Sequence, residues 1–506
     1  MYPAAQSTAR AIQRSLLQAT MSVDWQYLRE IAPELSVVVD LVIALVASAH
    51  VILNKTDTRS ATAWVGLIWL VPFLGALLYV FLGINRIERR ARELKAGATP
   101  YSVPLDDAPR APADLDRELG AEQARFVEHA RVVSRVTGWP LLVGNALDPL
   151  RDGDEAYPAM IEAIEGATCS ISFVSYIFEA KGVGAEMVAA LSAAVERGVE
   201  VRVLIDDVGS RYARPRIHRV LRKRGVPVAK FLQAFLPRSF THFNLRNHSK
   251  IMVVDGCVGF TGGINVRQDH VLAANPKHPT RDLHFRVRGP VVSQLQETFA
   301  KDWAFTTGEK LKGRIWFPEL EPFGDVLARG IVDGPDRSIN SLERVFLSAI
   351  TAARRSIRIV TPYFLPDRVL LQAMHLAGQR GVDVDIVVPE RGNLPVVRWA
   401  MWGHYRQVLR GRVRLWLSPA PFDHSKLIVV DSYWASIGSA NWDPRSLRLN
   451  FEFNLETYDD ELGAQLEAEA LNRIEGARLL TMEELDARSL TERLRDGTAR
   501  LLKPYL

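Results

Sequence analysis

Two short segments of this sequence place the same chemically active residue types at the same spacing. The first contains His248, Lys250, Asp255, Gly262 and Asn265. The second repeats all five types 176 residues further on, at His424, Lys426, Asp431, Gly438 and Asn441. A single histidine two residues before a lysine carries little information. Two copies in one register indicate a paired functional site.

These residue types suit the chemistry of a phosphate group. Lysine supplies a positive charge, asparagine supplies an amide donor, and two imidazoles can divide the nucleophilic and acid–base roles. We therefore expect Lys250, Lys426, Asn265 and Asn441 to bind phosphate oxygens. A metal site is not expected, because protonated lysine repels a cation and no carboxylate cluster accompanies the histidines. No cofactor is expected either.

The residues after each lysine predict a strand, because segments 251–254 and 427–430 are almost entirely β-branched or aliphatic. A histidine and a lysine two positions apart then project from one face, roughly 6–7 Å from each other. The motif aspartates, Asp255 and Asp431, lie seven positions after the histidines, roughly 20 Å along a strand. We include them in the catalytic motif and favour a role in bracing a turn.

Two further carboxylates occupy comparable places in the two copies. Asp282 and Glu452 each follow the histidine of their own copy by about thirty residues. Either could accept a hydrogen bond from an imidazole Nδ1–H, which would fix the tautomer and stabilise the imidazolium.

The elements that must position these residues are also duplicated. An α/β pattern over 163–206 recurs over 349–388. The sequence predicts two α/β domains with mixed β-sheets flanked by helices, over 136–320 and 321–506. We expect them to be related by an approximate two-fold axis, with the site on their shared face.

The N-terminal region has a different character. Apolar runs over 35–53 and 61–84 are each long enough to cross a hydrocarbon core of about 30 Å. They predict a transmembrane hairpin over 35–85, preceded by a cytoplasmic segment over 1–34 and followed by a linker over 86–135. The alternative is a buried helical hairpin in a soluble domain.

Charge near the second run predicts the orientation of the hairpin. Only Lys55 and Arg59 lie in the turn between the runs, whereas five basic residues follow the second run: Arg86, Arg89, Arg90, Arg92 and Lys95. Basic residues favour the cytoplasmic side. Both ends of the hairpin and the α/β domains are therefore expected in the cytoplasm.

Composition narrows the remaining possibilities. The chain has 506 residues, 48% apolar and 24% charged, which is typical of folded protein and excludes wholesale disorder. Its two cysteines, Cys169 and Cys257, exclude a disulfide framework, and we expect both to be buried thiols. Aromatic segments over 231–240 and 399–405 either contact the bilayer or pack in the core. The C-terminal stretch 490–502 is expected to pack on the second domain.

The doubled motif resembles that of the phospholipase D superfamily. The apolar hairpin resembles the two-helix membrane type of bacterial cardiolipin synthases, as do four flanking segments: 152–155, 281–282, 302–303 and 361–364. The resemblance covers nearly all of the chain beyond residue 34.

The resemblance implies transfer of a phosphatidyl group between two phosphatidylglycerol molecules without a metal. His248 would attack the phosphodiester, and His424 would protonate the departing glycerol. The phosphatidyl-histidine would then react with a hydroxyl of the second phosphatidylglycerol to give cardiolipin. The sequence itself is symmetrical, so the order of the histidines comes from the resemblance alone. The implied location is the bacterial cytoplasmic (inner) membrane, in contact with anionic lipid.

Other functions share parts of this pattern. A hydrolytic phospholipase D, or a transferase using phosphatidylethanolamine, would need the same motif. A nuclease of the superfamily expects a basic groove and no hairpin, and the net charge of +5 does not indicate nucleic acid as a partner. A non-catalytic membrane scaffold would leave the intact motifs without a purpose. The second lipid, the acyl-chain preference and the oligomeric state stay open.

Overall fold

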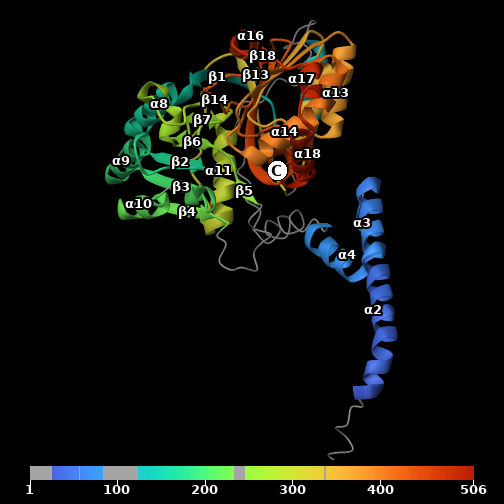
Figure 1. Ribbon diagram of the computed structural model, residues 1–506. Coiled ribbons are helices and arrows are strands. Elements are labelled where there is room, and N and C mark those ends of the chain that lie inside the picture. The colour runs from blue at the N-terminus through green and yellow to red at the C-terminus, as the bar shows by residue number, and fades with distance from the viewer. Residues whose placement is uncertain (1–24, 56, 84–122, 213, 233–244, 336–337) are drawn as a thin grey trace, which may run out of the picture. The chain divides into compact units, whose positions relative to one another are not determined.

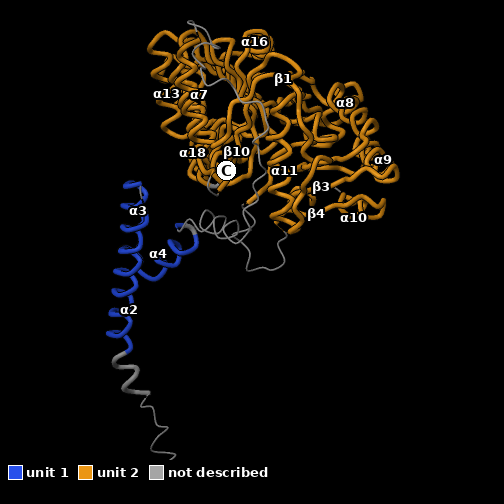
Figure 2. The backbone as a smooth tube through the Cα atoms, turned by 180° about the vertical axis from the view of Figure 1, so that it is seen from behind, with its two compact units in different colours: residues 1–86 blue, residues 87–506 orange. Residues whose placement is uncertain are grey.

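The structure is a computed structural model, and it describes residues 25–55, 57–83, 123–212, 214–232, 245–335 and 338–506 (Figure 1). The chain divides into two compact units, residues 1–86 and residues 87–506 (Figure 2). The basic residues expected to orient the hairpin lie outside the described residues.

The first unit begins with the long helix α2 (Trp25–Asn54). Its segment Ala32–Asn54 has a mean hydropathy of 2.4 over 23 residues, which is long and apolar enough to cross a membrane. Many of its aliphatic side chains are exposed, including Val37, Val38, Leu45, Val46 and Ile52. Exposed aliphatic side chains along a whole helix are typical of contact with lipid.

The second apolar run differs from the single helix expected over 61–84. It forms α3 (Thr58–Leu70), α4 (Pro72–Leu78) and a π-helical turn, Tyr79–Gly83. Helix α3 ends at Leu70, with Val71 as its C-cap, because Pro72 has no N–H to donate and its ring opposes a continuing helix. The 13 residues of α3 rise only about 20 Å. Among the described residues, one helix is therefore long enough to span a membrane.

The second unit is built on one mixed sheet. Its first half supplies β1 (Leu142–Arg151), β2 (Ser170–Ser175), β3 (Glu200–Asp206), β4 (Val228–Phe231), β6 (Ile251–Val254), β7 (Val258–Gly262) and β9 (Leu283–Arg288). Its second half supplies β10 (Val326–Asp333), β11 (Ser356–Val360), β12 (Asp383–Pro389), β13 (Val413–Ser418), β15 (Leu427–Val430), β16 (Trp434–Gly438), β17 (Asn450–Tyr458) and β18 (Arg478–Leu479).

The two halves use the same strand order. Inward from β4 the first half reads β4-β3-β2-β6-β7-β9-β1, and inward from β13 the second reads β13-β12-β11-β15-β16-β17-β10, with β18 added outside β13. Strand β2 pairs parallel with β3 and antiparallel with β6, as β11 does with β12 and β15. Antiparallel pairing of β1 with β10 joins the halves. The predicted mixed α/β fold is confirmed, and the sheet runs unbroken through both halves.

Helices cover the sheet (Figure 1). They are α7 (Ala124–Thr137), α8 (Asp152–Gly166), α9 (Val183–Glu196), α10 (Ile217–Lys223), α11 (Val292–Thr307), α12 (Ser341–Ala352), α13 (Arg368–Gln379), α14 (Pro395–Val408), α15 (Pro444–Arg448), α16 (Asp460–Glu475), α17 (Met482–Asp486) and α18 (Leu490–Leu501). One core cluster contains Val253 and Phe285 from the first half with Val429 and Phe453 from the second. Shared apolar burial therefore holds the halves together.

Helix α7 lies within the segment expected to be a linker. Its buried residues Phe126, Val127, Ala130 and Val133 recur with a helical period and join a core cluster. The C-terminal part of the expected linker, 86–135, is therefore helical, because this amphipathic face is buried by the second half of the sheet, and residues 86–122 lie outside the described residues.

The two cysteines are exposed, so the prediction of buried thiols is wrong. Cys169 precedes the first residue of β2, and Cys257 lies in the turn between β6 and β7. Both occupy strand ends, where the chain leaves the core. Strands β2 and β6 are buried along their whole length, but this burial does not extend to the cysteines.

Candidate active site

Each motif histidine is anchored by backbone hydrogen bonds to the opposite half. His248 N–H donates to Phe451 O at 2.8 Å, and His424 N–H donates to Arg281 O at 2.8 Å. Short strands make the same cross-connection: β5 (Arg246–Asn247) pairs with β17, and β14 (Phe422–Asp423) pairs with β8 (Thr280–Arg281). These pairings bring the two copies of the motif to one place.

Each motif histidine pairs through its side chain with a carboxylate from the other half of the sheet. His248 Nδ1 lies 2.9 Å from Glu452 Oε2, and His424 Nδ1 lies 2.7 Å from Asp282 Oδ2. Each carboxylate therefore meets the imidazole of the other half. A carboxylate at Nδ1 fixes the tautomer in which Nε2 carries the free lone pair. Nε2 of each imidazole is thus the nitrogen available for chemistry.

Burial favours the neutral form of both imidazoles. It lowers the pKa of His248, with a further decrease from Lys250, and it lowers the pKa of His424 well below the usual value. Although burial opposes ionisation of Glu452, the neighbouring His248 holds its pKa below the usual value. Burial raises the pKa of Asp282. A neutral imidazole beside an ionised carboxylate is the state that a nucleophile or general base requires.

The two motif lysines are buried beside the histidines. Lys250 Nζ donates to His248 O at 2.6 Å, and Lys426 Nζ bonds His424 O. Burial lowers the pKa of Lys250 to about 7 and the pKa of Lys426 to about 8. A phosphate anion bound beside these lysines would stabilise their protonated form and raise their pKa values again.

The asparagines lie just beyond the strands that return beside the histidines. Asn265 Oδ1 accepts from Ile177 N–H at 3.1 Å, and Asn441 Nδ2 donates to Ser446 Oγ at 3.2 Å. Strands β6 and β7, like β15 and β16, pair antiparallel, which brings the asparagines back toward the histidines. The motif glycine Gly262 has φ 150°, and a Cβ on it would lie 2.6 Å from Leu283 O.

The motif aspartates do not contact the imidazoles. Asp255 accepts backbone hydrogen bonds from residues 168–170, and Asp431 accepts them from residues 354–356 and pairs with Arg125 at 2.8 Å. Both have positive φ, at 50° and 55°, which the turn after the strand requires. In the structure they brace the β-strand ends, the role that the strand length favoured, and their inclusion among the catalytic residues stays a prediction.

The sequence pattern did not single out three further polar residues at the site. His270 and His284 are buried, with pKa values lowered by burial to about 3 and about 4. The ring centroid of Tyr176 lies 5.1 Å from that of His248. His284 stands two positions after Asp282, and this short spacing was the available signal. The other two are single residues with no motif around them.

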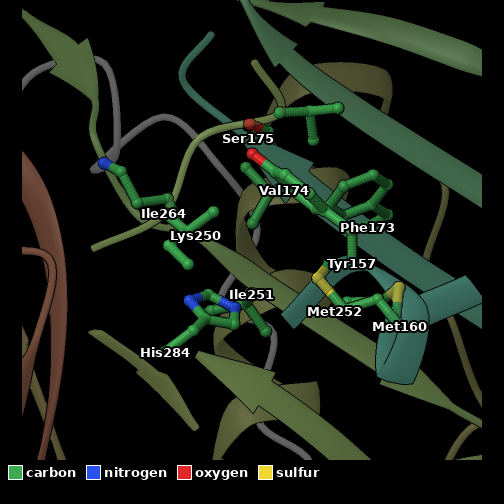
Figure 3. A pocket seen from close by; sticks show the side chains of 11 residues that line it. Tyr157, Met160, Phe173, Val174, Ser175, Lys250, Ile251, Met252, Ile264 and His284 are labelled. Carbon is green, nitrogen blue, oxygen red and sulfur yellow. The ribbon is translucent and has the colours of Figure 1, made fainter. Parts of the chain in front are cut away.

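A small pocket adjoins the first lysine. It encloses about 10 Å³, the volume of a single water position, and its lining includes Lys250, His284, Tyr157 and Ser175 (Figure 3). Figure 3 shows these polar side chains among apolar neighbours such as Phe173. Within the described ranges, no group of three or more His, Cys, Asp or Glu side chains is placed to hold a metal ion.

Comparison with known proteins places this site in a family. A family model described as "Cardiolipin synthase, PLD-like domain" matches residues 160–303 and 346–474, and one described as "Phospholipase_D-nuclease N-terminal" matches residues 42–83. The two parts of the first match contain the two histidine motifs. The chain belongs to this family of proteins with cardiolipin synthase, PLD-like domains.

Individual relatives agree with this class. The chain is 31% identical to cardiolipin synthase 2 of Staphylococcus epidermidis over 464 residues, covering 90% of this chain and 94% of the relative. It is 31% identical to the major cardiolipin synthase ClsA of Bacillus subtilis over 473 residues, covering 91% and 97%. The fold is similar to that of phosphatidylserine synthase from Haemophilus influenzae, with a TM-score of 0.57, 16% identity, and coverage of 75% of this chain and 100% of that one.

Proposed function

We propose that this protein is a cardiolipin synthase that transfers a phosphatidyl group between two phosphatidylglycerol molecules and releases glycerol. The proposal rests on one observation: each motif histidine is paired with a carboxylate of the other half, His248 with Glu452 and His424 with Asp282. Full-length similarity to proteins named cardiolipin synthases supports the choice of reaction.

The first step forms a covalent intermediate. His248 Nε2 attacks the phosphorus of one phosphatidylglycerol, and the bond from phosphorus to the glycerol oxygen breaks. His424 is protonated once the anionic phosphodiester lies beside it and offsets the burial of its charge, and it gives this proton to that oxygen, so free glycerol leaves and a phosphatidyl-histidine remains. Glu452 stabilises the positive charge that develops on His248. Lys250 and Lys426, with Asn265 and Asn441, bind the phosphate oxygens in the transition state.

The second step regenerates the enzyme. His424, now neutral, removes a proton from the terminal hydroxyl of a second phosphatidylglycerol. The hydroxyl oxygen attacks phosphorus, the phosphorus–nitrogen bond breaks, and cardiolipin is released with both histidines restored. His424 ends the cycle protonated and ready for the next donor. Asp282 holds its Nδ1–H throughout.

Burial of the site favours transfer to an alcohol over hydrolysis. His248 is 8% exposed, Lys250 2% and Lys426 4%. Water that cannot reach the intermediate cannot compete with a bound lipid hydroxyl. Phosphatidylglycerol is accordingly the expected second substrate.

The wider organisation forms part of the proposal. Residues 136–320 and 321–506 are two phospholipase D-like domains related by an approximate two-fold axis, a relation supported by their matching strand orders. The N-terminal apolar region, including α2, anchors the protein as an integral protein of the bacterial cytoplasmic membrane, with the domains on the cytoplasmic side.

The test is a product analysis with the purified full chain. Supplied with phosphatidylglycerol in vesicles, it should form cardiolipin and an equal amount of glycerol, as measured by mass spectrometry. Phosphatidic acid as the sole lipid product would mean hydrolysis, and consumption of added phosphatidylethanolamine would mean another donor. A preparation that converts none of these lipids would refute the proposal. His248→Ala and His424→Ala are the matched inactive variants.

A further inference from the structure

The N-terminal end of helix α8 lies against the segment that carries Asp282. Helix α8 begins at Asp152, directly after β1, and β1 pairs antiparallel with β9 up to Arg151 and Leu283. Asp152 and Asp282 therefore face each other across the end of this strand pair. The segment 152–155 is one of the four flanking segments that carry the family resemblance, and no step of the proposed reaction uses it.

Asp152 makes two hydrogen bonds to the backbone of Asp282. Its N–H donates to Asp282 O at 3.0 Å, and its Oδ1 accepts from Asp282 N–H at 2.8 Å. Asp152 has φ 55°, a left-handed conformation that aspartate and asparagine adopt more readily than other residues with a side chain. In this conformation a single residue presents both its N–H and its carboxylate to the same partner.

Asp282 needs this support because it lies at an interruption of the sheet. The residue stands between β8, which ends at Arg281, and β9, which begins at Leu283, and it belongs to neither strand. Asp282 is buried, and its Oδ2 lies 2.7 Å from His424 Nδ1. A buried N–H without an acceptor is costly, so the Oδ1 of Asp152 holds the backbone from which this carboxylate projects.

The equivalent carboxylate of the second half is held by the sheet itself. Glu452 lies inside β17 and pairs in register with Asp333 at the end of β10. The carboxylate of Asp333 accepts from Gly334 N–H at 2.9 Å and from Ser341 N–H at 3.3 Å, so it turns toward the start of α12. Both halves place an aspartate opposite the carboxylate residue, but of these two aspartates only Asp152 directs its side chain to the backbone of that residue.

Helix α8 also fixes the chain that leads to Asp282. Asp154 accepts from the backbone N–H groups of Leu272 and Ala273 at 2.7 and 3.1 Å. The Tyr157 hydroxyl donates to the backbone oxygen of Asn265 at 2.5 Å. The N-terminal part of α8 therefore holds the chain at three points, from the motif asparagine to the carboxylate that meets the second histidine.

The side chain of Asp152 remains an acceptor at neutral pH. Burial raises its pKa to about 6, although the hydrogen bond from Asp282 N–H opposes this increase. Asp423 adds to the increase, and Arg281 opposes it. The group is therefore mostly ionised above pH 6. An amide oxygen could accept the same hydrogen bond, so the contact needs the oxygen and not its charge.

We propose that Asp152 is a positioning residue for the acid–base steps of the reaction. By holding the N–H and the carbonyl of Asp282, it aims the carboxylate of Asp282 at Nδ1 of His424. This inference rests on the proposed function, because it uses the role of His424, and it deepens that function by giving the start of α8 a part in it. Asp152 acts through Asp282.

The test compares two variants of Asp152 in the purified full chain. Asp152→Asn keeps a side-chain oxygen and tolerates positive φ, whereas Asp152→Gly permits the same φ and removes the oxygen. The matched control is Asp148→Ala, which removes an aspartate of β1 that pairs with Arg286 and Arg288 of β9. Each protein is assayed with phosphatidylglycerol vesicles and with a phosphatidyl ester of p-nitrophenol, whose departure needs no proton from His424.

We expect Asp152→Gly to lower kcat for cardiolipin formation about 10²-fold with KM nearly unchanged, because a displacement of about 1 Å is enough for such a loss. Asp152→Asn and Asp148→Ala should keep a kcat close to that of the wild type. With the ester, the first release of p-nitrophenol by His248 should keep its wild-type rate and amplitude in Asp152→Gly. The later turnover, which needs His424, should slow.

Three results would overturn the positioning role. An unchanged kcat in Asp152→Gly would mean that Asp282 is held without this oxygen. Equal losses in Asp152→Gly and Asp152→Asn would mean that the hydrogen bond is not the cause. A first release that slows or shrinks as much as the turnover would assign Asp152 to the stability of the fold alone.

The ester also separates this inference from the proposed function. A wild-type protein that turns over the ester but makes no cardiolipin would refute the choice of lipid substrate. The comparison of Asp152→Gly with Asp152→Asn in the second step would still decide the role of Asp152. A wild-type protein that does not cleave the ester would overturn both.

Discussion

The two histidine centres share a motif but hold their carboxylates in different ways. At His248, Glu452 also accepts hydrogen bonds from Ser439 Oγ at 2.5 Å and Asn450 Nδ2 at 3.0 Å. At His424, Asp282 accepts from the backbone N–H of Leu283 at 2.8 Å. These partners fix each carboxylate before it meets its imidazole.

The difference follows from one residue beside each motif glycine. Ser439 in the second half stands where the first half has Gly263. A Cβ on Gly263 would overlap the carboxylate of Asp282, so the shorter acid occupies the space that the missing side chain leaves. The longer Glu452 is held by the serine hydroxyl instead. Side-chain length and the neighbouring residue are therefore matched within each half, although each carboxylate serves the other half.

The largest expected effect separates the roles of the two histidines. His248→Asn and His424→Asn should each lower kcat with phosphatidylglycerol by about 10⁵-fold, because both act in one unit. With a phosphatidyl ester of p-nitrophenol, whose departure needs no proton, His424→Asn should accumulate a phosphatidyl-protein adduct detectable by mass spectrometry. His248→Asn should not. An adduct in His248→Asn alone would reverse the assignment.

Neutral substitutions of Glu452 and Asp282 test whether each carboxylate acts on the histidine of the other half. Glu452→Gln and Asp282→Asn should each lower kcat about 10³-fold with little change in KM, because the imidazole loses its orientation and the imidazolium its counter-charge. With the p-nitrophenol ester, Glu452→Gln should slow adduct formation by His248, and Asp282→Asn should leave that step nearly unchanged. If Asp282→Asn slowed adduct formation equally, the cross-half pairing would be wrong.

Substitutions at the equivalent positions Gly263 and Ser439 test whether Asp282 and Glu452 are held in different ways. Gly263→Ala should lower kcat about 10²-fold, because the new methyl group displaces Asp282 by a fraction of an ångström or more. Ser439→Ala should lower it about tenfold, the value of one hydrogen bond to a charged group. Steady-state assays with phosphatidylglycerol measure both. Equal effects would mean that the two carboxylates are held alike.

The motif aspartates should affect stability, and unequally. Asp431 is fully buried and pairs with Arg125, so Asp431→Asn should cost about 3 kcal/mol. Asp255 is half-buried and bonds backbone amides and Thr168, so Asp255→Asn should cost about 1 kcal/mol. Thermal unfolding of the detergent-solubilised chain gives the order of Tm values. Loss of kcat at unchanged Tm would indicate a catalytic role instead.

The smallest expected effect distinguishes the two lysines by pH. Lys250 has a pKa of about 7 and Lys426 one of about 8, and only the protonated amines bind phosphate. Because these charges are lost as pH rises through those values, KM should increase about tenfold from pH 7 to pH 8. Lys250→Arg should remove the part of the rise that begins near pH 7. A KM that falls with pH would contradict the expected sign.

Much of the fold and site followed from spacing in the chain. The strands after Lys250 and Lys426, the mixed sheet and the braced positions of Asp255 and Asp431 depend on local pattern, which the sequence records directly. Exposure of Cys169 could not be read this way, because it depends on where the strand stops. The break at Pro72 was not predicted, because a transmembrane helix can tolerate a proline where neighbouring groups satisfy the freed carbonyl, and only the tertiary structure decides whether they do.

The sequence by itself determined which residue types recur and how far apart they stand along each copy. It therefore specified a doubled phosphate chemistry. The tertiary structure decided that Glu452 serves His248 and Asp282 serves His424, because pairing of β5 with β17 and of β14 with β8 crosses between the halves. It also decided the pKa values of the lysines and histidines. Those values depend on desolvation by residues distant in the chain, which no local spacing encodes.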